Sequence, residues 1–449
     1  MMIPTFSSLC SSIASPSFKR RILVSALLFC GLQLISCKSQ TTVAEKTATE
    51  NKMISLPAGK PFDPSEKNRL YLASERWFDS LLKNSGFNGG MLVAKNGQVV
   101  FEKYRGTTKL HGTDSITAET PFHIASVSKT FTAMAVLKLY QDGKVGLDDE
   151  FSKYFPSFNY PGVTVRTLLS HRSGLPNYLY FMEDLGWNKE VMIKNQDVLD
   201  YLVNRKADLT NIAPPNRHFT YCNTNFALAA LLIEKVSGMS YPEFISQTFF
   251  QPLGMTHSFV YTPADSAKVP PSYDWRGGEI PLNFLDQVYG DKNIFSTPRD
   301  LLIWDRALSS NAIFKPETLA QAYAGYSNEK PGIKNYGLGW RMNNYPNGKK
   351  MIFHNGWWHG NNAVFIRLFD EDATIILVNN RFTSAVYKAR HLVNSFGNYF
   401  QEDVEEEAES SSPATPGLQT TQVLPLKAKP VTPFQRSLQD KNRPPRKKK

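Results

Sequence analysis

Ser126 and Lys129 stand three residues apart and precede an apolar run of good helix formers, residues 131–140. If Ser126 opens that helix, the two side chains share one face and the lysine amine can reach the serine hydroxyl. A serine alcohol is a weak nucleophile until a neighbouring base takes its proton, so burial or a nearby cation must keep the lysine partly neutral. The helix N-terminus would also aim backbone N–H groups at an oxyanion. The pair predicts acyl transfer through a serine ester, although S-x-x-K alone is a weak signal.

A tyrosine and an asparagine, Tyr221 and Asn223, stand two residues apart just before another apolar segment, residues 226–236. In an extended turn both side chains can face one cleft. A tyrosine near a cationic lysine would have its pKa lowered and could act as a proton relay, while the amide could hold a substrate carbonyl and bind Lys129. An isolated Tyr-x-Asn is more often structural, so this pair gains meaning only beside Ser126.

A third group, His354, Gly356 and Trp357, lies in a stretch that leaves one predicted strand and enters the next. Gly356 would let a substrate backbone approach closely. The Trp357 N–H could be the second oxyanion donor beside that of Ser126. We expect Gly356 and Trp357 to lie at the substrate pocket.

Elements that position these groups follow from periodicity. Helical spacing marks residues 70–82, and alternation across an Asn96-Gly97 turn predicts a hairpin over residues 89–106. Strands are expected at 351–353, 363–369 and 374–379, with Thr297 capping a helix and a closing helix at 385–400. Strands at both ends and helical patterns between them predict an α+β fold. Its antiparallel sheet is built from both chain ends and flanked by helices, with an inserted, mostly helical subdomain.

The chain ends differ in composition from the middle. A basic cluster at 19–21 precedes an apolar run at 22–35, as in a secretion signal, and the following Cys37 resembles the acylated cysteine of a bacterial lipobox. That resemblance implies residues 1–37 as a lipoprotein signal peptide, Cys37 as the lipid attachment site and a place in the bacterial cell envelope. We interpret 38–64 as a flexible tether, 65–400 as the catalytic domain and 401–449 as a disordered tail, first acidic and then basic.

Charge and cysteine content exclude several classes of protein. The net charge of +11 comes largely from the leader and the C-terminal tail, so the middle is only mildly basic and nucleic-acid binding is not expected. Removal of the leader and lipidation leave Cys222 alone, so the mature domain has no internal disulfide, and Cys222 reads as a small buried filler. No G-x-S-x-G or His-Glu-x-x-His occurs, and neither a metal nor a cofactor is expected.

The order and spacing of Ser126-x-x-Lys129, Tyr221-x-Asn223 and His354-x-Gly356 resemble the serine β-lactamase and penicillin-binding-protein superfamily. The particular resemblance is to the branch with class C β-lactamases, D-alanyl-D-alanine carboxypeptidases and esterases, and it covers roughly residues 70–400. It implies a β-lactamase/transpeptidase-like fold and a two-step acyl transfer. In that scheme Ser126 attacks, and Lys129 and Tyr221 move the proton. Asn223 holds the acyl side chain, and His354 lines the pocket for the substrate carboxylate or leaving group.

Departures from the family pattern bear on the substrate. The third motif reads His-Asn-Gly where many relatives have Lys-Thr-Gly or His-Thr-Gly, and a neutral histidine attracts a carboxylate less than a lysine does. Trp357 also brings a large ring where small residues are common. We expect a serine hydrolase acting on an amide or ester, either a cell-wall-like D-amino-acid peptide or a small carboxyl ester. A class C-like β-lactamase and a non-catalytic, envelope-anchored binding protein remain as alternatives, and the oligomeric state is open.

Overall fold

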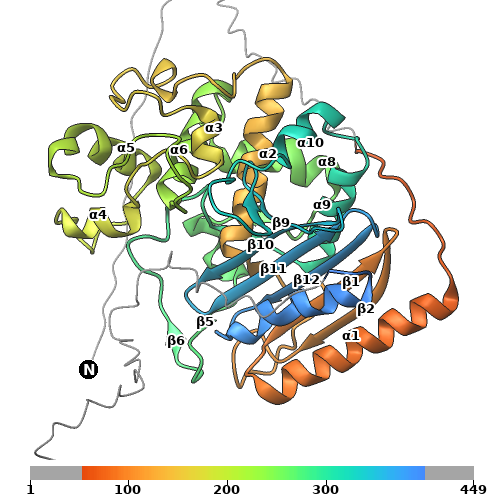
Figure 1. The fold of residues 1–449 in the computed structure, drawn as a ribbon. Helices are drawn as coiled ribbons and strands as arrows, with labels where there is room; N and C mark the ends of the chain where they lie inside the picture. The colour runs from red at the N-terminus through yellow and green to blue at the C-terminus, as the bar shows by residue number, and fades with distance from the viewer. Residues whose placement is uncertain (1–52, 400–449) are drawn as a thin grey trace, which may run out of the picture. The chain divides into compact units, whose positions relative to one another are not determined.

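A seven-stranded antiparallel sheet forms the centre of the computed structural model, which describes residues 53–399 (Figure 1). In spatial order its strands are β2 (Gln98–Arg105), β1 (Gly89–Lys95), β12 (Ala373–Asn379), β11 (Asn361–Leu368), β10 (Lys350–Trp358), β9 (Arg341–Asn344) and β8 (Lys334–Tyr336). The first strand of the domain pairs with the last, Gly89 lying opposite Asn379. The predicted α+β fold, with a sheet assembled from both chain ends, is therefore confirmed.

Local sequence explains how the sheet begins and where its core lies. The turn between β1 and β2 places Asn96 at φ 53° and Gly97 at φ 72°, the two positive values that a tight hairpin turn needs. Every residue of β11 and β12 is buried, in keeping with the apolar runs that these strands carry. Along β1 the side chains alternate between two cores, because successive residues of a strand point to opposite faces.

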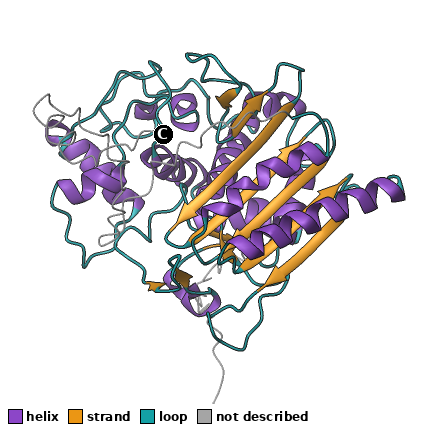
Figure 2. Ribbon diagram, turned by 60° about the horizontal axis from the view of Figure 1, so that its bottom comes forward, coloured by secondary structure: helices purple, strands orange, loops and turns teal. Residues whose placement is uncertain are grey.

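One face of the sheet is covered by the first and last helical segments, α1 (Pro64–Asn84) and the 3-10 helix η6 (Ser384–Ser395) (Figure 2). Met91 and Val93 of β1 pack there with Phe78 of α1 and Val386 of η6. Leu92 belongs to the larger core on the opposite face. The predicted closing helix over residues 385–400 is thus present as a 3-10 helix that ends at Ser395.

The opposite face carries the remaining helices, and residues between β3 and β7 supply most of them (Figure 1). They are η1 (Ala125–Val127), α2 (Ser128–Gln141), η2 (Phe151–Lys153), α3 (Val165–Leu169), α4 (Tyr178–Asp184), α5 (Asn195–Asn204), η3 (Lys206–Asp208), α6 (Asn223–Ser237), α7 (Tyr241–Ile245), η4 (Ser246–Phe250), α8 (Gln251–Leu253), η5 (Pro263–Lys268), α9 (Pro298–Ser309) and α10 (Pro316–Ala322). Two smaller sheets join them, one of β3 (Phe122–His123), β7 (Ile294–Ser296) and β4 (Phe259–Val260), and one of β5 (Ser272–Tyr273) and β6 (Glu279–Ile280).

Helix ends follow the capping signals of the sequence. Thr297 accepts a hydrogen bond from the backbone N–H of Asp300 at the start of α9, and Gly238 takes the left-handed conformation that ends α6. Strand β10, in contrast, is longer than the predicted 351–353. It continues to Trp358 through the third motif, so His354, Gly356 and Trp357 lie within a strand and not in a connection.

Residues 53–63 have no regular structure but contact the domain, since the backbone N–H of Ile54 donates to the Pro252 carbonyl. Within residues 53–399, no helix is long and apolar enough to cross a membrane. Cys37, the predicted signal peptide and the predicted tail at 401–449 lie outside the described residues.

Candidate active site

Ser126 and Lys129 meet at the start of α2, as their spacing predicts. Ser126 lies in the single turn η1 directly before α2, and the Lys129 Nζ is 3.0 Å from the Ser126 Oγ. The same amine donates to the backbone carbonyl of Asp291 at 2.7 Å. Both side chains are buried, Lys129 completely. An amine that donates to a carbonyl and contacts the serine hydroxyl is placed to exchange a proton with that hydroxyl.

The backbone before Ser126 is held in a strained conformation. Ala125 has φ 48°, a left-handed value that residues with a Cβ seldom adopt. Its N–H donates to Nδ1 of His123 at 3.0 Å, and the other ring nitrogen of His123 is 3.0 Å from the Asn293 Oδ1. Because Nδ1 accepts, Nε2 carries the proton and donates to Asn293. His123 thus fixes the turn that presents Ser126.

Gly356 gives β10 its close approach to this turn. A Cβ at Gly356 would lie 2.3 Å from the Ile124 carbonyl oxygen and 3.1 Å from both the Ala125 Cβ and the Ser126 backbone nitrogen. The sequence predicts that this glycine lets a substrate backbone approach closely, and that stays a prediction. The structure shows that the glycine lets the strand reach the backbone of Ser126. The Ser126 N–H therefore lies beside the Gly356 backbone, and Trp357 is the next residue of the strand.

Tyr221 borders the same amine. The Lys129 Nζ lies 5.1 Å from the centroid of the Tyr221 ring and 5.7 Å from that of Phe226. Asn223 is buried and is the first residue of α6, so the Tyr-x-Asn pair straddles the start of a helix whose face packs against α2. The second motif is therefore brought to the first by helix packing.

Two histidines around Tyr221 are buried and neutral. His354 and His171 are both fully buried, with ring centroids 6.3 Å and 4.3 Å from that of Tyr221. Burial is the main cause that lowers the pKa of each well below its ordinary value. Positive charge on Lys129 and Arg341 adds to the effect. His354 approaches the Tyr336 hydroxyl through Nε2, at 3.2 Å, and His171 accepts from the Cys222 N–H. A neutral His354 cannot supply the cation that a lysine gives in related motifs.

Arg341, which the sequence did not predict as a site residue, places a cation beside the Tyr221 ring. It stands on β9 opposite Phe353 of β10, and the central carbon of its guanidinium is 5.0 Å from the centroid of the Tyr221 ring. An arginine remains charged and offers a planar fork that matches a carboxylate. None of the three sequence motifs includes this arginine.

A second missed feature holds the segment that leads into Tyr221. Arg172 donates through Nε to the Asn216 side chain and through Nη1 to Glu329, at 2.9 and 2.8 Å. The other oxygen of Glu329 accepts the backbone N–H of Phe219 at 2.5 Å. Two separate loops therefore fix residues 216–219, and we call Arg172 and Glu329 the loop clamp. Their separation of 157 positions left no local signal.

The remaining predicted residues have defined places. The Trp357 indole N–H donates to the His359 carbonyl, and its ring contacts Phe382. Cys222 is a buried free cysteine, and burial raises the pKa of its thiol to about 11, as expected for a filler. Across residues 53–399 no group of three or more His, Cys, Asp or Glu side chains could hold a metal ion.

Comparison with known proteins agrees with this geometry. The family described as Beta-lactamase matches residues 75–395. "Penicillin-binding protein 4*" of Bacillus subtilis (strain 168) is 30% identical over 332 residues, which are 69% of this chain and 72% of that protein. "Protein flp" of Staphylococcus aureus (strain NCTC 8325 / PS 47) is 28% identical, and the match covers 64% of this chain and 59% of that protein.

Solved structures share the fold. A penicillin-binding protein from Bacillus halodurans matches with a TM-score of 0.62 at 21% identity, over 73% of this chain and 98% of that one. D-amino acid amidase from Ochrobactrum anthropi SV3, solved with L-phenylalanine amide, matches with a TM-score of 0.60 at 21% identity, over 74% and 98%. At this identity the likeness concerns the fold alone.

Proposed function

The chain belongs to the beta-lactamase family, and from that premise we propose that it is a serine hydrolase that forms an acyl-enzyme on Ser126. The observation that carries the proposal is the 3.0 Å contact between the buried Lys129 amine and the Ser126 hydroxyl. A buried lysine with no chemical task would be costly, because a charged group loses its hydration there. A binding protein that had lost the chemistry would have no need of this pair.

The chemistry runs in two steps. The Ser126 oxygen attacks the substrate carbonyl while its proton passes to Lys129, and the oxyanion forms between the Ser126 and Trp357 backbone N–H groups. The carbonyl then re-forms, the bond to the leaving group breaks, and Tyr221 and Lys129 return the proton to the departing nitrogen or oxygen. Water attacks the serine ester, giving the free acid and restoring the hydroxyl.

The positive charge of Arg341 beside Tyr221 favours a substrate that carries a carboxylate. His354 is neutral there, but Arg341 keeps a permanent positive charge beside the Tyr221 ring. This cation offsets the weakness that the His-Asn-Gly motif suggested. We therefore favour a cell-wall-like D-amino-acid peptide, whose terminal carboxylate Arg341 would bind, over an uncharged ester. The penicillin-binding relatives support the same choice.

A substrate panel tests this function. Purified protein is incubated with a D-Ala-D-Ala peptide, the same peptide as its C-terminal amide, a cephalosporin and a p-nitrophenyl ester, beside Ser126→Ala. We expect cleavage of the free-acid peptide, and no cleavage by Ser126→Ala. Arg341→Gln should cleave the free-acid peptide more slowly, and its effect on cleavage of the C-terminal amide should be far smaller. If the cephalosporin is hydrolysed faster than the free-acid peptide, the protein is better described as a β-lactamase. If the uncharged ester is hydrolysed faster, it is better described as an esterase. Turnover of none would favour the binding protein.

We also propose that Cys37 anchors the mature protein in the bacterial cell envelope. The basic cluster, apolar run and lipobox-like cysteine support this, and an acyl chain adds membrane affinity of about 0.8 kcal/mol per buried CH₂. Expressed in a bacterium, the protein should enter the detergent phase on phase partitioning, and Cys37→Ala should not. Equal partitioning of both would contradict the lipid anchor.

A further inference from the structure

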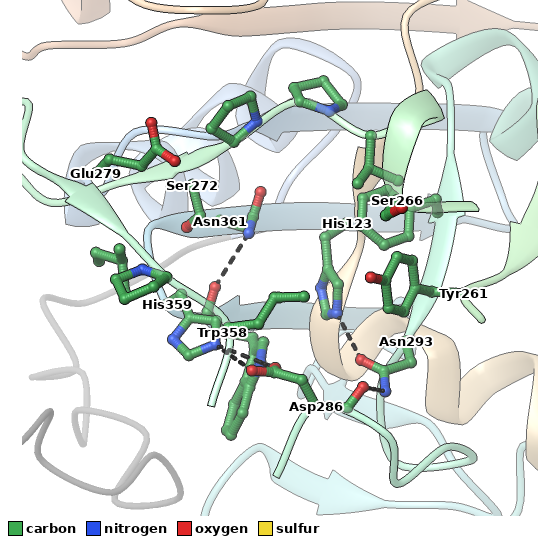
Figure 3. Close-up of a pocket in the computed structure, with 17 residues that line it drawn as sticks. His123, Tyr261, Ser266, Ser272, Glu279, Asp286, Asn293, Trp358, His359 and Asn361 are labelled. Atoms are coloured by element: carbon green, nitrogen blue, oxygen red, sulfur yellow. Dashed lines mark hydrogen bonds and ion pairs between the residues drawn. The ribbon is translucent and has the colours of Figure 1, made fainter. Parts of the chain in front are cut away.

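A cavity of about 210 Å³ lies beside the end of β10, under the small hairpin of β5 and β6 (Figure 3). Its walls combine apolar side chains with a few polar ones. His123, Trp358 and His359 border it from the sheet side, and Ser272 and Glu279 from the hairpin. Neither Ser126 nor Lys129 lines it, so it is a space next to the catalytic groups and not the nucleophile's own pocket.

The cavity lies on the path that a substrate would take along β10. His354, Gly356 and Trp358 alternate with Asn355 and Trp357 and so point to one face of the strand. Gly356 abuts Ser126, and Trp358 at the cavity stands about 7 Å further along, away from His354. A substrate whose carboxylate faces Arg341 therefore has its acyl part directed towards the cavity.

Two carboxylates, Glu279 and Asp286, line the cavity, and Asp286 is paired with the His359 ring nitrogen Nε2 at 3.0 Å. Glu279 is an exposed carboxylate on the hairpin. Asp286 is buried, and although burial favours its neutral form, hydrogen bonds from His359, the Asn283 backbone and Trp358 hold its pKa below the ordinary value. Burial lowers the pKa of His123 to about 4, so that imidazole brings no positive charge near neutral pH.

Positive side chains are placed elsewhere. Among residues 53–399, no lysine or arginine lines the cavity. The buried Lys292 amine lies behind the wall, 4.7 Å from the centroid of the Trp358 ring and 3.5 Å from a carboxylate oxygen of Asp291. Apolar residues, including Val269, Pro271 and Ile280, complete the wall and could cover a hydrocarbon stem.

We propose that this cavity is a specificity site for an alkylammonium side chain on the acyl part of the substrate, with Glu279 as its main charged partner. The proposal rests on the function proposed above, because it needs a substrate attached at Ser126. The proposed site would make the protein prefer a substrate with a lysine-like side chain over one with a neutral side chain. The three sequence motifs do not determine this preference.

Two peptides that differ only in acetylation of the lysine Nε test it: Nα-acetyl-Lys-D-Ala-D-Ala, which keeps the ammonium charge, and Nα,Nε-diacetyl-Lys-D-Ala-D-Ala, which lacks it. We expect kcat/KM to favour the free amine by about two- to five-fold, as for one exposed ion pair. Glu279→Gln should bring the ratio close to one and leave the diacetyl peptide unaffected. Glu317→Gln, an exposed carboxylate on α10, is the matched control and should keep the preference.

Equal rates on both peptides, or a preference that survives Glu279→Gln, would overturn the proposal while leaving the hydrolase function intact. If neither peptide is cleaved, the carboxypeptidase function fails. The alkylammonium site is then tested separately, by competition of small ligands with fluorophosphonate labelling. Pentylamine should then slow fluorophosphonate labelling of Ser126 more than pentanol does, and only with Glu279 present. Equal competition by the two would overturn the alkylammonium site.

Discussion

Gly356→Ala should separate β10 from the nucleophile's backbone. The added methyl carbon would sit 2.3 Å from the Ile124 carbonyl oxygen, about 1 Å inside an ordinary contact between carbon and oxygen. All three nearest atoms belong to the Ile124–Ser126 segment, and two of them are backbone atoms. Because backbone atoms cannot rotate away as a long side chain can, the strand or the Ser126 turn must move.

A shift of that size has a calculable effect. Misplacing a catalytic group by about 1 Å costs on the order of 100-fold in rate, and overpacking a buried site lowers the free energy of unfolding by about 1–3 kcal/mol. We therefore expect the variant to fold but to be acylated about 100-fold more slowly. The two assays are the second-order rate of fluorophosphonate labelling at Ser126 and urea unfolding followed by circular dichroism.

Gly86→Ala is the matched control. A methyl there would meet only the guanidinium of Arg381, the far end of a flexible side chain, at 2.7–2.9 Å. It should label at the wild-type rate. If folded Gly356→Ala also labels within about two-fold of wild type, against the 100-fold loss that the displacement implies, the Gly356 approach does not position the oxyanion hole and the reasoning fails.

Three further predictions concern residues around the nucleophile. Lys129→Ala should lose about 10²- to 10⁴-fold in acylation rate and keep its circular dichroism spectrum, whereas a wild-type rate would remove Lys129 from the mechanism. The lowered pKa of His123, about 4, means that the unfolded chain binds this proton first as pH falls. His123 should therefore contribute a stability loss of about 3 kcal/mol between pH 6.5 and 4, read in urea unfolding as the difference in pH slope between wild type and His123→Asn, and equal slopes would contradict this. Glu329→Ala, which removes one partner of the loop clamp before Tyr221, should slow acylation about ten-fold and change stability by less than about 1 kcal/mol. A large loss of stability with an unchanged acylation rate would show that the clamp is purely structural.

Local patterns predicted those parts of the protein that depend on near neighbours in sequence. The reach of Lys129 to Ser126 follows from a spacing of three, and the β1–β2 turn follows from Asn96-Gly97. The Thr297 cap is a similar case. Each of these features is decided within a few residues, so periodicity and capping rules are sufficient.

Features that depend on distant parts of the chain were not predicted. The stretch with Gly356 was expected to leave one strand and enter the next, yet it lies inside β10, because the strand passes close to Ser126 and glycine leaves room for it. Arg341 reaches the Tyr221 ring from a neighbouring strand, and Glu329 contacts Arg172 across two loops. Such contacts depend on tertiary packing, which overrides local preference.

Covalent labelling of Ser126 tests the central claim most directly. Wild type and Ser126→Ala are incubated with a fluorescent penicillin and with a fluorophosphonate, and intact mass and the labelled peptide are read. The account predicts one adduct per chain on Ser126, from the penicillin as well as the fluorophosphonate, and none in Ser126→Ala. Labelling that persists in Ser126→Ala, or no adduct from either reagent, would contradict a serine acyl-enzyme at this site.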